Sequence, residues 1–367
     1  MSQRWLRIIA AVVAFAVIAY IGIVTVGNFS AGVNPATGID QIGANSFALV
    51  LAVALVVAFV AYAAIEYAQT RALASIASQF DTRTIVLMPL AIALNIILGQ
   101  AVGAALKIPI YLDSVGTILV GALAGPIPGL LTGFLANILW TYVVPPPFNS
   151  SVAAAFAIVA AVIGLLAGLF GRMGWLRPRP NRSPAQLMLG GVAALVIVLG
   201  LALYAYTRFY KGGFEFFSNL PGTPFYFTLL GWLIALLFVA FIVGFLALLF
   251  LRRDLTVAFV VIAGVVTGMI AALISAPISA NVFSGVTGSG TDFLVAAFRS
   301  GGSSIGDAVL QQGLLSDPVD KLVTFFTVYL ILNTMASRLK ARFPQGERLV
   351  EQGADDDPEP PLREASA

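Results

Sequence analysis

The sequence contains no cysteine and no histidine among its 367 residues. The first absence rules out disulfide bonds and thiolate chemistry. The second removes the commonest protein ligand of transition metals and the usual proton shuttle near neutral pH. We therefore expect no metal site and no cofactor. A membrane enzyme such as a lipid-modifying transferase needs convergent acids, bases or a metal, so an enzyme is disfavoured as well.

Charged residues are scarce, at 10% of the chain, whereas 59% of the residues are hydrophobic and the mean hydropathy is +0.97. A water-facing surface needs far more charge than this. The alternating ten-residue segments of a membrane β-barrel are absent. The net charge of +3 comes from arginines between apolar segments and does not indicate a nucleic-acid surface. The composition predicts an all-α integral membrane protein in contact with the lipid bilayer.

A nucleotide-binding GxxxxGK[ST] motif is also missing. The glycine-rich run at residues 285–291, Gly-Val-Thr-Gly-Ser-Gly-Thr, lacks the lysine that holds phosphate in such a loop. If the chain takes part in ATP-driven uptake, the ATPase must be another chain.

The apolar residues divide into about ten membrane segments, which predicts a polytopic helical bundle. The first segment is longer than the apolar part of a signal peptide and lacks a small-x-small cleavage site, so we expect a retained helix. The segments are residues 6–27, 45–67, 85–106, 113–124, 127–143, 151–171, 186–206, 225–250, 256–282 and 319–337.

Residues 107–140 differ from an ordinary span. The stretch starts with Lys107, Tyr111 and Asp113, runs apolar for about ten residues, breaks at Gly-Pro-Ile-Pro-Gly and resumes as a second apolar run. A membrane crossing takes roughly 20 helical residues, so residues 115–124 are too short to span alone. Interrupted segments of this kind often indicate a binding site, because protein or a water-filled cavity must cover them.

The positive-inside rule supports counting the short segment as a crossing. With the N-terminus inside, most arginines and lysines near span ends fall on the inner side, and few fall on the outer side. The inner group is Arg4, Arg7, Arg71, Arg83, Arg172, Arg177, Arg179, Arg182, Arg252, Arg253, Arg338, Lys340 and Arg342. The outer group is Lys107, Arg208, Lys211 and Arg299. This arrangement predicts cytoplasmic N- and C-termini and a cytoplasmic turn at residues 125–129.

Two further stretches are polar. Residues 284–318 form the longest predicted external connection and contain amphipathic stretches, which suits either a lid over an outward-facing pocket or a plain surface loop. Residues 344–367 are polar, acidic and proline-containing, which predicts a disordered tail. No signalling output module is expected after residue 340.

The motifs around the short segment resemble those of a known family. They are Ile-Pro-Ile-Tyr-Leu-Asp-Ser at residues 108–114, the Gly-Pro break that follows, Ser-Ala-Pro-Ile-Ser at 275–279, the glycine-rich run at 285–290, and Ser-Asp-Pro-Val-Asp-Lys at 316–321. In this order they resemble the substrate-binding S components of energy-coupling factor (ECF) transporters. The resemblance covers about 150 of the 367 residues, in two blocks.

The resemblance implies a six-helix core with extra helices added to it. Two extra helices precede the core and two more are inserted within it, so the core keeps its orientation. The predicted division is 1–84 for the N-terminal helix pair, 85–182 for the first part of the core, 183–254 for the inserted pair, 255–343 for the second part of the core with its external loop, and 344–367 for the tail.

The resemblance also implies a function, a set of partners and a location. An S component captures a vitamin-like or other small micronutrient at the outer face of a prokaryotic cytoplasmic membrane. It works with a transmembrane coupling subunit and two cytoplasmic ATPases, and it does no chemistry on its substrate. Two alternatives stay open from the residues alone: a membrane sensor domain for a small ligand, and a stand-alone secondary transporter.

Candidate substrate-binding residues lie around the outer ends of the predicted core helices. Asp113 either contacts substrate or, with Ser114, only caps the helix that starts at residue 115; Asp113 is also a partner for Lys107. The amide of Gln100 is either a ligand group or interhelical glue. The full set is Asp113, Ser114, Gln100, Asn137, Trp140, Tyr142, Asn281 and Lys321.

Two of these assignments have competing local explanations. Trp140 and Tyr142 suit a stacking platform for a flat ring, and equally suit anchors at the membrane interface. Lys321 lies four residues after Asp317, so a helical ion pair behind an Asp317-Pro318 helix start explains it as well.

Small residues four apart predict a close helix contact. Gly99 and Gly103 have this spacing, and with Ala91 and Asn95 they are candidates for docking the coupling subunit, as an alanine-rich face does in S components. Internal packing explains the same spacing, and Gly129 and Gly133 are a parallel case.

Overall fold

The computed structural model describes residues 3–211 apart from 28, 30–32, 35–37, 40 and 106–110, and residues 242–350 apart from 252 and 301, together with 236 and 239. Lys107 and most of the predicted segment at 225–250 lie outside the described residues.

The regular structure of the described chain is helical except for a hairpin of two two-residue strands. The helices are α1 (Gln3–Val26), α2 (Gln41–Thr70), α3 (Ala74–Ala77), α4 (Thr82–Gly99), α5 (Val115–Ala124), α6 (Pro126–Tyr142), α7 (Ala157–Arg172), α8 (Pro184–Lys211), α10 (Thr256–Val282), α11 (Asp292–Ser300), α12 (Ile305–Thr334) and α13 (Ser337–Lys340). Shorter elements are the π-helical η1 (Gln100–Ala105), the 3-10 helices η2 (Ala153–Phe156) and η3 (Gly346–Leu349), and strands β1 (Val33–Asn34) and β2 (Gly38–Ile39).

Six helical stretches in the described part of the chain are long and apolar enough to cross a membrane. They are Arg4–Val26, Ile42–Thr70, Thr82–Val102, Ala153–Arg172, Pro184–Tyr204 and Thr256–Val282. The prediction of a helical membrane protein is thus confirmed, whereas the count of about ten segments is not. The short segment is a helix, Val115–Ala124, that is too short to span alone.

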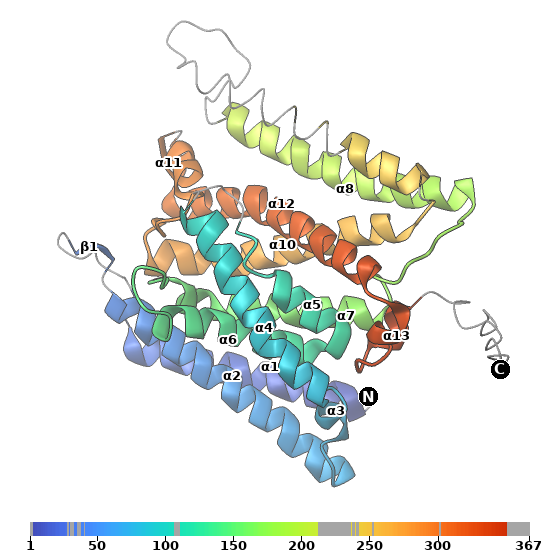
Figure 1. Cartoon of the computed structure of the whole chain (residues 1–367). Helices are drawn as coiled ribbons and strands as arrows, with labels where there is room; N and C mark the ends of the chain where they lie inside the picture. The colour runs from blue at the N-terminus through green and yellow to red at the C-terminus, as the bar shows by residue number, and fades with distance from the viewer. Residues whose placement is uncertain are drawn as a thin grey trace, which may run out of the picture.

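The six helices expected to form a core, α4, α5, α6, α7, α10 and α12, pack against one another in space (Figure 1). Helices α1 and α2 pair with each other along one side, and α8 packs on α10 at the opposite side. The start of α1 lies at the same end of the bundle as α3 and α13, and α11 and β1 lie at the other end. We call these the α13 end and the α11 end.

Glycines bring α5, α6 and α7 into backbone contact. A Cβ atom at Gly164 of α7 would lie 2.1 Å from the carbonyl oxygen of Gly129, and one at Gly133 would lie 2.2 Å from that of Ala160. Such contacts replace the missing hydrophobic driving force between helices in a bilayer. Gly129 and Gly133 therefore serve internal packing, and α5 is held by its neighbours despite its length.

Helix α4 holds the start of α5 by a different device. The Asn95 side chain accepts a hydrogen bond from Gly116 N (2.7 Å) and donates one to Thr117 Oγ1 (2.8 Å). The first backbone N–H groups of a helix lack partners within that helix, so a buried amide from a neighbour satisfies one of them. Neither Asp113 nor Ser114 caps α5 with its side chain, and the capping explanation of these two residues is wrong.

The turn between α5 and α6 is the single residue Gly125, with φ of +132°. A Cβ there would meet Gln79 Oε1 at 2.4 Å. That oxygen accepts a hydrogen bond from Ile127 N, and Gln345 N donates to Leu123 O (2.8 Å). The segment after α13 thus folds under the turn, and the structured chain continues through residue 350, beyond the predicted start of the tail at 344.

The last core helix begins earlier than the sequence suggested. Ser304 caps α12 by accepting from Asp307 N, and the helix runs through Pro318, so residues 305–318 are not loop and Asp317-Pro318 is not a helix start. A proline inside a helix has no N–H to bond the carbonyl four residues earlier, and its ring clashes with that carbonyl. Helix α10 packs closely against this position at Gly268, because a Cβ there would lie 2.3 Å from Pro318 Cα.

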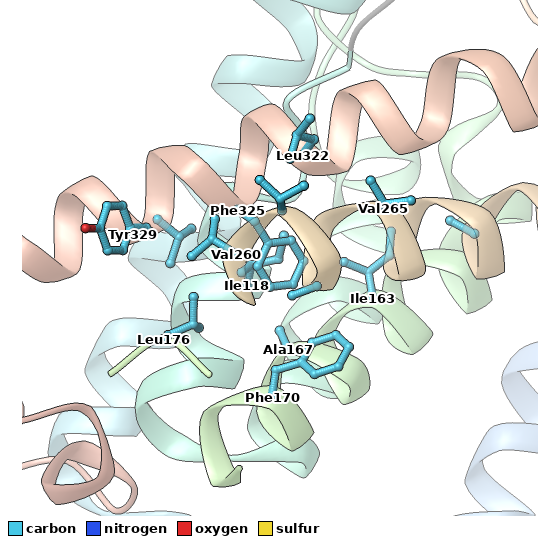
Figure 2. Close-up of a cluster of buried hydrophobic side chains, with 14 of the residues drawn as sticks. Ile118, Ile163, Ala167, Phe170, Leu176, Val260, Val265, Leu322, Phe325 and Tyr329 are labelled. Carbon is cyan, nitrogen blue, oxygen red and sulfur yellow. The ribbon is translucent and has the colours of Figure 1, made fainter. Parts of the chain in front are cut away.

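A hydrophobic core fills the centre of the bundle between α5, α7, α10 and α12 (Figure 2). Phe325 of α12 is fully buried and meets Phe170 of α7 edge to face, with ring centroids 6.0 Å apart. Its other labelled members are Ile118, Ile163, Ala167, Leu176, Val260, Val265, Leu322 and Tyr329.

We predict that Gly164→Ala lowers the stability of the purified protein, because its Cβ has no room against the α6 backbone. Overpacking of this kind costs about 1–3 kcal/mol. The matched control is Gly200→Ala in α8, where nothing lies within 4 Å of the added Cβ. Thermal unfolding in detergent should show a lower midpoint for the first variant and an unchanged or higher one for the second. Equal midpoints would contradict the close contact.

Candidate functional site

A cavity of about 350 Å³ opens within the half of the bundle nearer α11. It lies where α4, α6 and α10 end and where α5 and α7 begin, and the first half of α12 runs along it. Its polar lining comes from segments far apart in the sequence: Gln100, Tyr111, Asp113, Ser114, Asn137, Asn149, Ser150, Ser151, Ser275, Ser279, Thr287, Ser289, Thr291, Asp292, Gln312, Asp317, Asp320 and Lys321. Its apolar lining includes Trp140, Phe156, Val159, Ile163 and Val309.

The hydrophobic core forms the floor of the cavity. Ile163 belongs both to the cavity lining and to the core cluster drawn in Figure 2. Below it, towards the α13 end, the packed side chains of Ile118, Ala167 and Phe325 fill the space. The cavity is therefore a pocket at one end of the bundle, of a size that suits a small organic molecule.

Lys321 is the central charged residue of this site. Its Nζ donates to Asp320 Oδ2 at 2.5 Å and to Ser114 Oγ at 2.7 Å, and lies 3.6 Å from Asp113 Oδ1. The Lys321 and Asp320 side chains are 5% and 1% exposed, whereas Asp113 is 27% exposed. A buried ion pair needs its remaining hydrogen-bonding capacity satisfied, and Ser114 helps to do this.

Asp320 also fixes the chain that leads into α5. Its Oδ1 accepts from the backbone N–H groups of Tyr111 and Leu112, both at 2.9 Å. Leu112 has a positive φ of 52°, which costs a non-glycine residue energy and needs support from its surroundings. The Asp320 carboxylate supplies this support, so α12 determines where Asp113 and Ser114 lie.

Asp317 lies one turn before Lys321 but does not pair with it. Its carboxylate accepts hydrogen bonds from the hydroxyls of Ser316 (3.1 Å) and Ser275 (3.3 Å). Lys321 makes its ion pairs with Asp320 and Asp113, so the predicted helical pair between Asp317 and Lys321 is wrong. Asp317 instead presents a carboxylate with neutral partners to the cavity.

The connection after α10 covers part of the cavity. Asp292 accepts from the backbone N–H groups of Thr287 (3.1 Å) and Gly288 (2.7 Å), which closes a compact turn. Thr291 Oγ1 lies 2.7 Å from the hydroxyl of Tyr111, so this turn is joined to the segment before α5. Burial, and then the charge of Asp317, raise the pKa of the Tyr111 phenol, which stays protonated.

Helix α11 packs over this end with its apolar face. Leu294, Val295 and Phe298 contact Ala308 and Val309 of α12. The amphipathic stretch predicted at 292–297 is therefore a packed helix and not a plain surface loop. Whether it opens as a lid stays a prediction.

Six of the eight predicted binding residues line the cavity: Gln100, Asp113, Ser114, Asn137, Trp140 and Lys321. The other two do not. Tyr142 is 51% exposed and its hydroxyl donates to Asn45 Oδ1, and Asn281 is exposed and donates to the carbonyl of Pro277. Tyr142 projects away because it lies two residues after Trp140 on the helix, on another face.

Trp140 is buried inside the protein and is not an interface anchor. Its indole N–H donates to Phe148 O (3.0 Å), and its ring lies over Gly99, where a Cβ would come within 2.6 Å. Gly99 therefore makes room for this ring.

Three of the four residues predicted to dock a partner pack inside the protein. Ala91 and Asn95 are buried against α5, and Gly99 lies beneath Trp140, so internal packing describes all three. Gly103 lies in η1, and its burial is outside what the structure describes. The exposed large apolar residues of α4 are Ile85, Val86, Leu90 and Ile97.

Sequence reasoning missed several cavity residues. In the sequence, Ser279, Thr291 and Asp320 stand out only as parts of longer motifs. The signal for Asp320 was its place next to a lysine in an otherwise apolar segment, because charged residues in such segments usually face a partner or cavity.

Comparison of the chain with protein-family models, with curated proteins and with solved structures finds no match in any of the three.

We predict that Lys321→Met destabilises the protein, because it leaves the Asp320 carboxylate buried without a countercharge. Removing one partner of a buried pair costs about 3–5 kcal/mol. The double variant Asp320→Asn/Lys321→Met should recover much of this loss, because the asparagine oxygen still accepts from Tyr111 and Leu112. Thermal unfolding in detergent measures both. A double variant no more stable than Lys321→Met would show that the charge is not the cause.

Proposed function

We propose that this chain is the solute-capturing membrane subunit of an ATP-driven importer of the ECF type, and that it takes up a vitamin-like or other small micronutrient. The observation that carries the proposal is the cavity at the α11 end. It is large enough for a small organic molecule, its polar side chains come from η1, α6, α10, α11, α12 and the connections between helices, and a packed core closes it below. Such a site suits capture of a solute from one side of a membrane.

The charge distribution supports an outward-facing cavity. The ends of α2 and α7 and the starts of α4 and α8 lie at the α13 end, and this end is rich in arginine. The arginines and lysines there include Arg4, Arg7, Arg71, Arg83, Arg172, Arg177, Arg179, Arg182, Arg338, Lys340, Arg342 and Arg348. By the positive-inside rule the α13 end is cytoplasmic, and the cavity faces the outside of a prokaryotic cytoplasmic membrane.

The motifs that resemble S components also contribute to the cavity. Tyr111, Asp113 and Ser114 come from the motif at 108–114, Ser275 and Ser279 come from the motif at 275–279, and the turn at 287–292 overlaps the glycine-rich run at 285–290. Asp317, Asp320 and Lys321 belong to the last. Four of the five motifs thus contribute to one cavity, which favours a shared binding role over a coincidence of composition. The Gly-Pro break lies instead beneath the segment that follows α13.

The proposal leaves energy coupling to other chains. A transmembrane coupling subunit and two cytoplasmic ATPases would bias a reorientation of this subunit that substrate binding makes favourable. A sensor domain or a secondary transporter would use the same cavity without ATPases.

The test is purification of the tagged full chain from its native membranes in mild detergent. We expect a polytopic coupling subunit and two Walker-motif ATPases at stoichiometric levels, identified by mass spectrometry. A tagged unrelated polytopic protein from the same membranes is the control for carry-over. Recovery of a histidine kinase in their place would favour the sensor. Solute uptake by the chain alone in proteoliposomes, driven without ATP, would favour the secondary transporter.

A further inference from the structure

The cavity has an excess of negative charge. Four aspartates, Asp113, Asp292, Asp317 and Asp320, and one lysine, Lys321, line it. Lys321 is already engaged with Asp320 at 2.5 Å, and its distance to Asp113 is 3.6 Å. Among the described residues no lysine or arginine nitrogen lies within 4 Å of Asp317 or Asp292.

The four aspartates differ in the hydrogen bonds and ion pairs that their carboxylates make. Asp320 accepts two backbone N–H groups besides the lysine, and Asp292 accepts those of Thr287 and Gly288. Asp317 has two serine hydroxyls at 3.1 and 3.3 Å, and Asp113 has the more distant ammonium. Carboxylates close together in a low-dielectric site repel one another unless a cation lies between them. A positive charge on a ligand would therefore stabilise Asp113 and Asp317 the most.

A second observation points to a ligand at this place. Asn137 and Ser279 line the cavity, are only 5% and 7% exposed, and make no side-chain hydrogen bond with any described residue. Buried polar groups normally have partners. An amide and a hydroxyl that face the cavity without one are suited to a bound solute.

The size and the aromatic lining indicate what kind of cation fits. A volume of about 350 Å³ is far larger than a single metal ion needs, and no group of three metal-ligating side chains occurs among the described residues. Tyr111, Trp140 and Phe156 line the same space. Aromatic faces attract organic ammonium groups and stack on flat rings.

We infer that the captured solute is an organic cation, whose positively charged nitrogen lies near Asp113 and Asp317 and whose apolar part contacts the aromatic lining. This inference rests on the proposed function, because it names the substrate class of the same cavity. Asn137 and Ser279 would hydrogen-bond the polar groups of that solute.

The absence of cysteine makes a direct test of the charge possible. Ser279→Cys places one thiol in the cavity, and Asn281→Cys places one at the exposed surface of the same end. Membrane vesicles with the full chain are treated from outside with cationic trimethylammonium-ethyl or anionic sulfonatoethyl methanethiosulfonate. The thiolate attacks the reagent, a mixed disulfide forms and methanesulfinate leaves. At each cysteine the rate with the cationic reagent is divided by the rate with the anionic one. The ratio at Ser279→Cys is then normalised to the ratio at Asn281→Cys.

We expect the normalised ratio to favour the cationic reagent by about tenfold or more, as charged clefts do for counter-ions. Asp113→Asn or Asp317→Asn in the same background should lower it several-fold. Asp307→Asn, on the same helix but exposed and outside the cavity, should not. A ratio near one, or a preference for the anion, would overturn the organic-cation inference and leave the importer proposal standing.

No reaction with either reagent, at Ser279→Cys and at a second reporter, Ala160→Cys, would show that outside solutes do not reach the cavity. That outcome would overturn both proposals, so the two failures are distinguishable. Ala160 lines the same cavity and carries no hydrogen-bonding side chain, so this second variant leaves the polar contacts intact.

Discussion

The buried pair of Lys321 and Asp320 joins the two parts of the core that the sequence separates. Asp320 accepts hydrogen bonds from the backbone N–H groups of Tyr111 and Leu112, and Lys321 donates one to Ser114. One turn of α12 therefore determines how the chain enters α5. Helix α5 is too short to span a membrane, and its position depends on such contacts and on the glycine packing of α6 and α7. The entry segment, attached to α12 in this way, supplies Tyr111, Asp113 and Ser114 to the cavity lining.

Much of the helical architecture was predictable, because apolar length and glycine-proline breaks are local properties of the sequence. The short helix at Val115–Ala124 and the turn at Gly125 followed from them. The continuous α12 did not follow, because Pro318 and Asp317 together resemble a helix start. The close approach of Gly268 on another helix to Pro318 is a tertiary contact that this local pattern does not reveal.

The candidate site was predictable where a polar residue interrupts an apolar helix, as with Asp113, Gln100 and Asn137. It was not predictable for groups whose direction depends on tertiary packing. Tyr142 and Trp140 are two residues apart and of similar chemistry, yet one faces Asn45 at the surface and the other lies on Gly99. The partner of Lys321 likewise depended on the approach of α5, which spacing within α12 does not reveal.

The fold-back of the chain after α13 has a practical consequence for anyone who shortens this protein. Gln345 lies beneath the α5–α6 turn, bonded to Leu123 O, and Arg348 donates to Arg172 O at the end of α7. A chain cut after the last long helix would keep every apolar segment and still uncover the Gly125 turn to water. Truncations and affinity tags therefore need to leave the protein intact through residue 350.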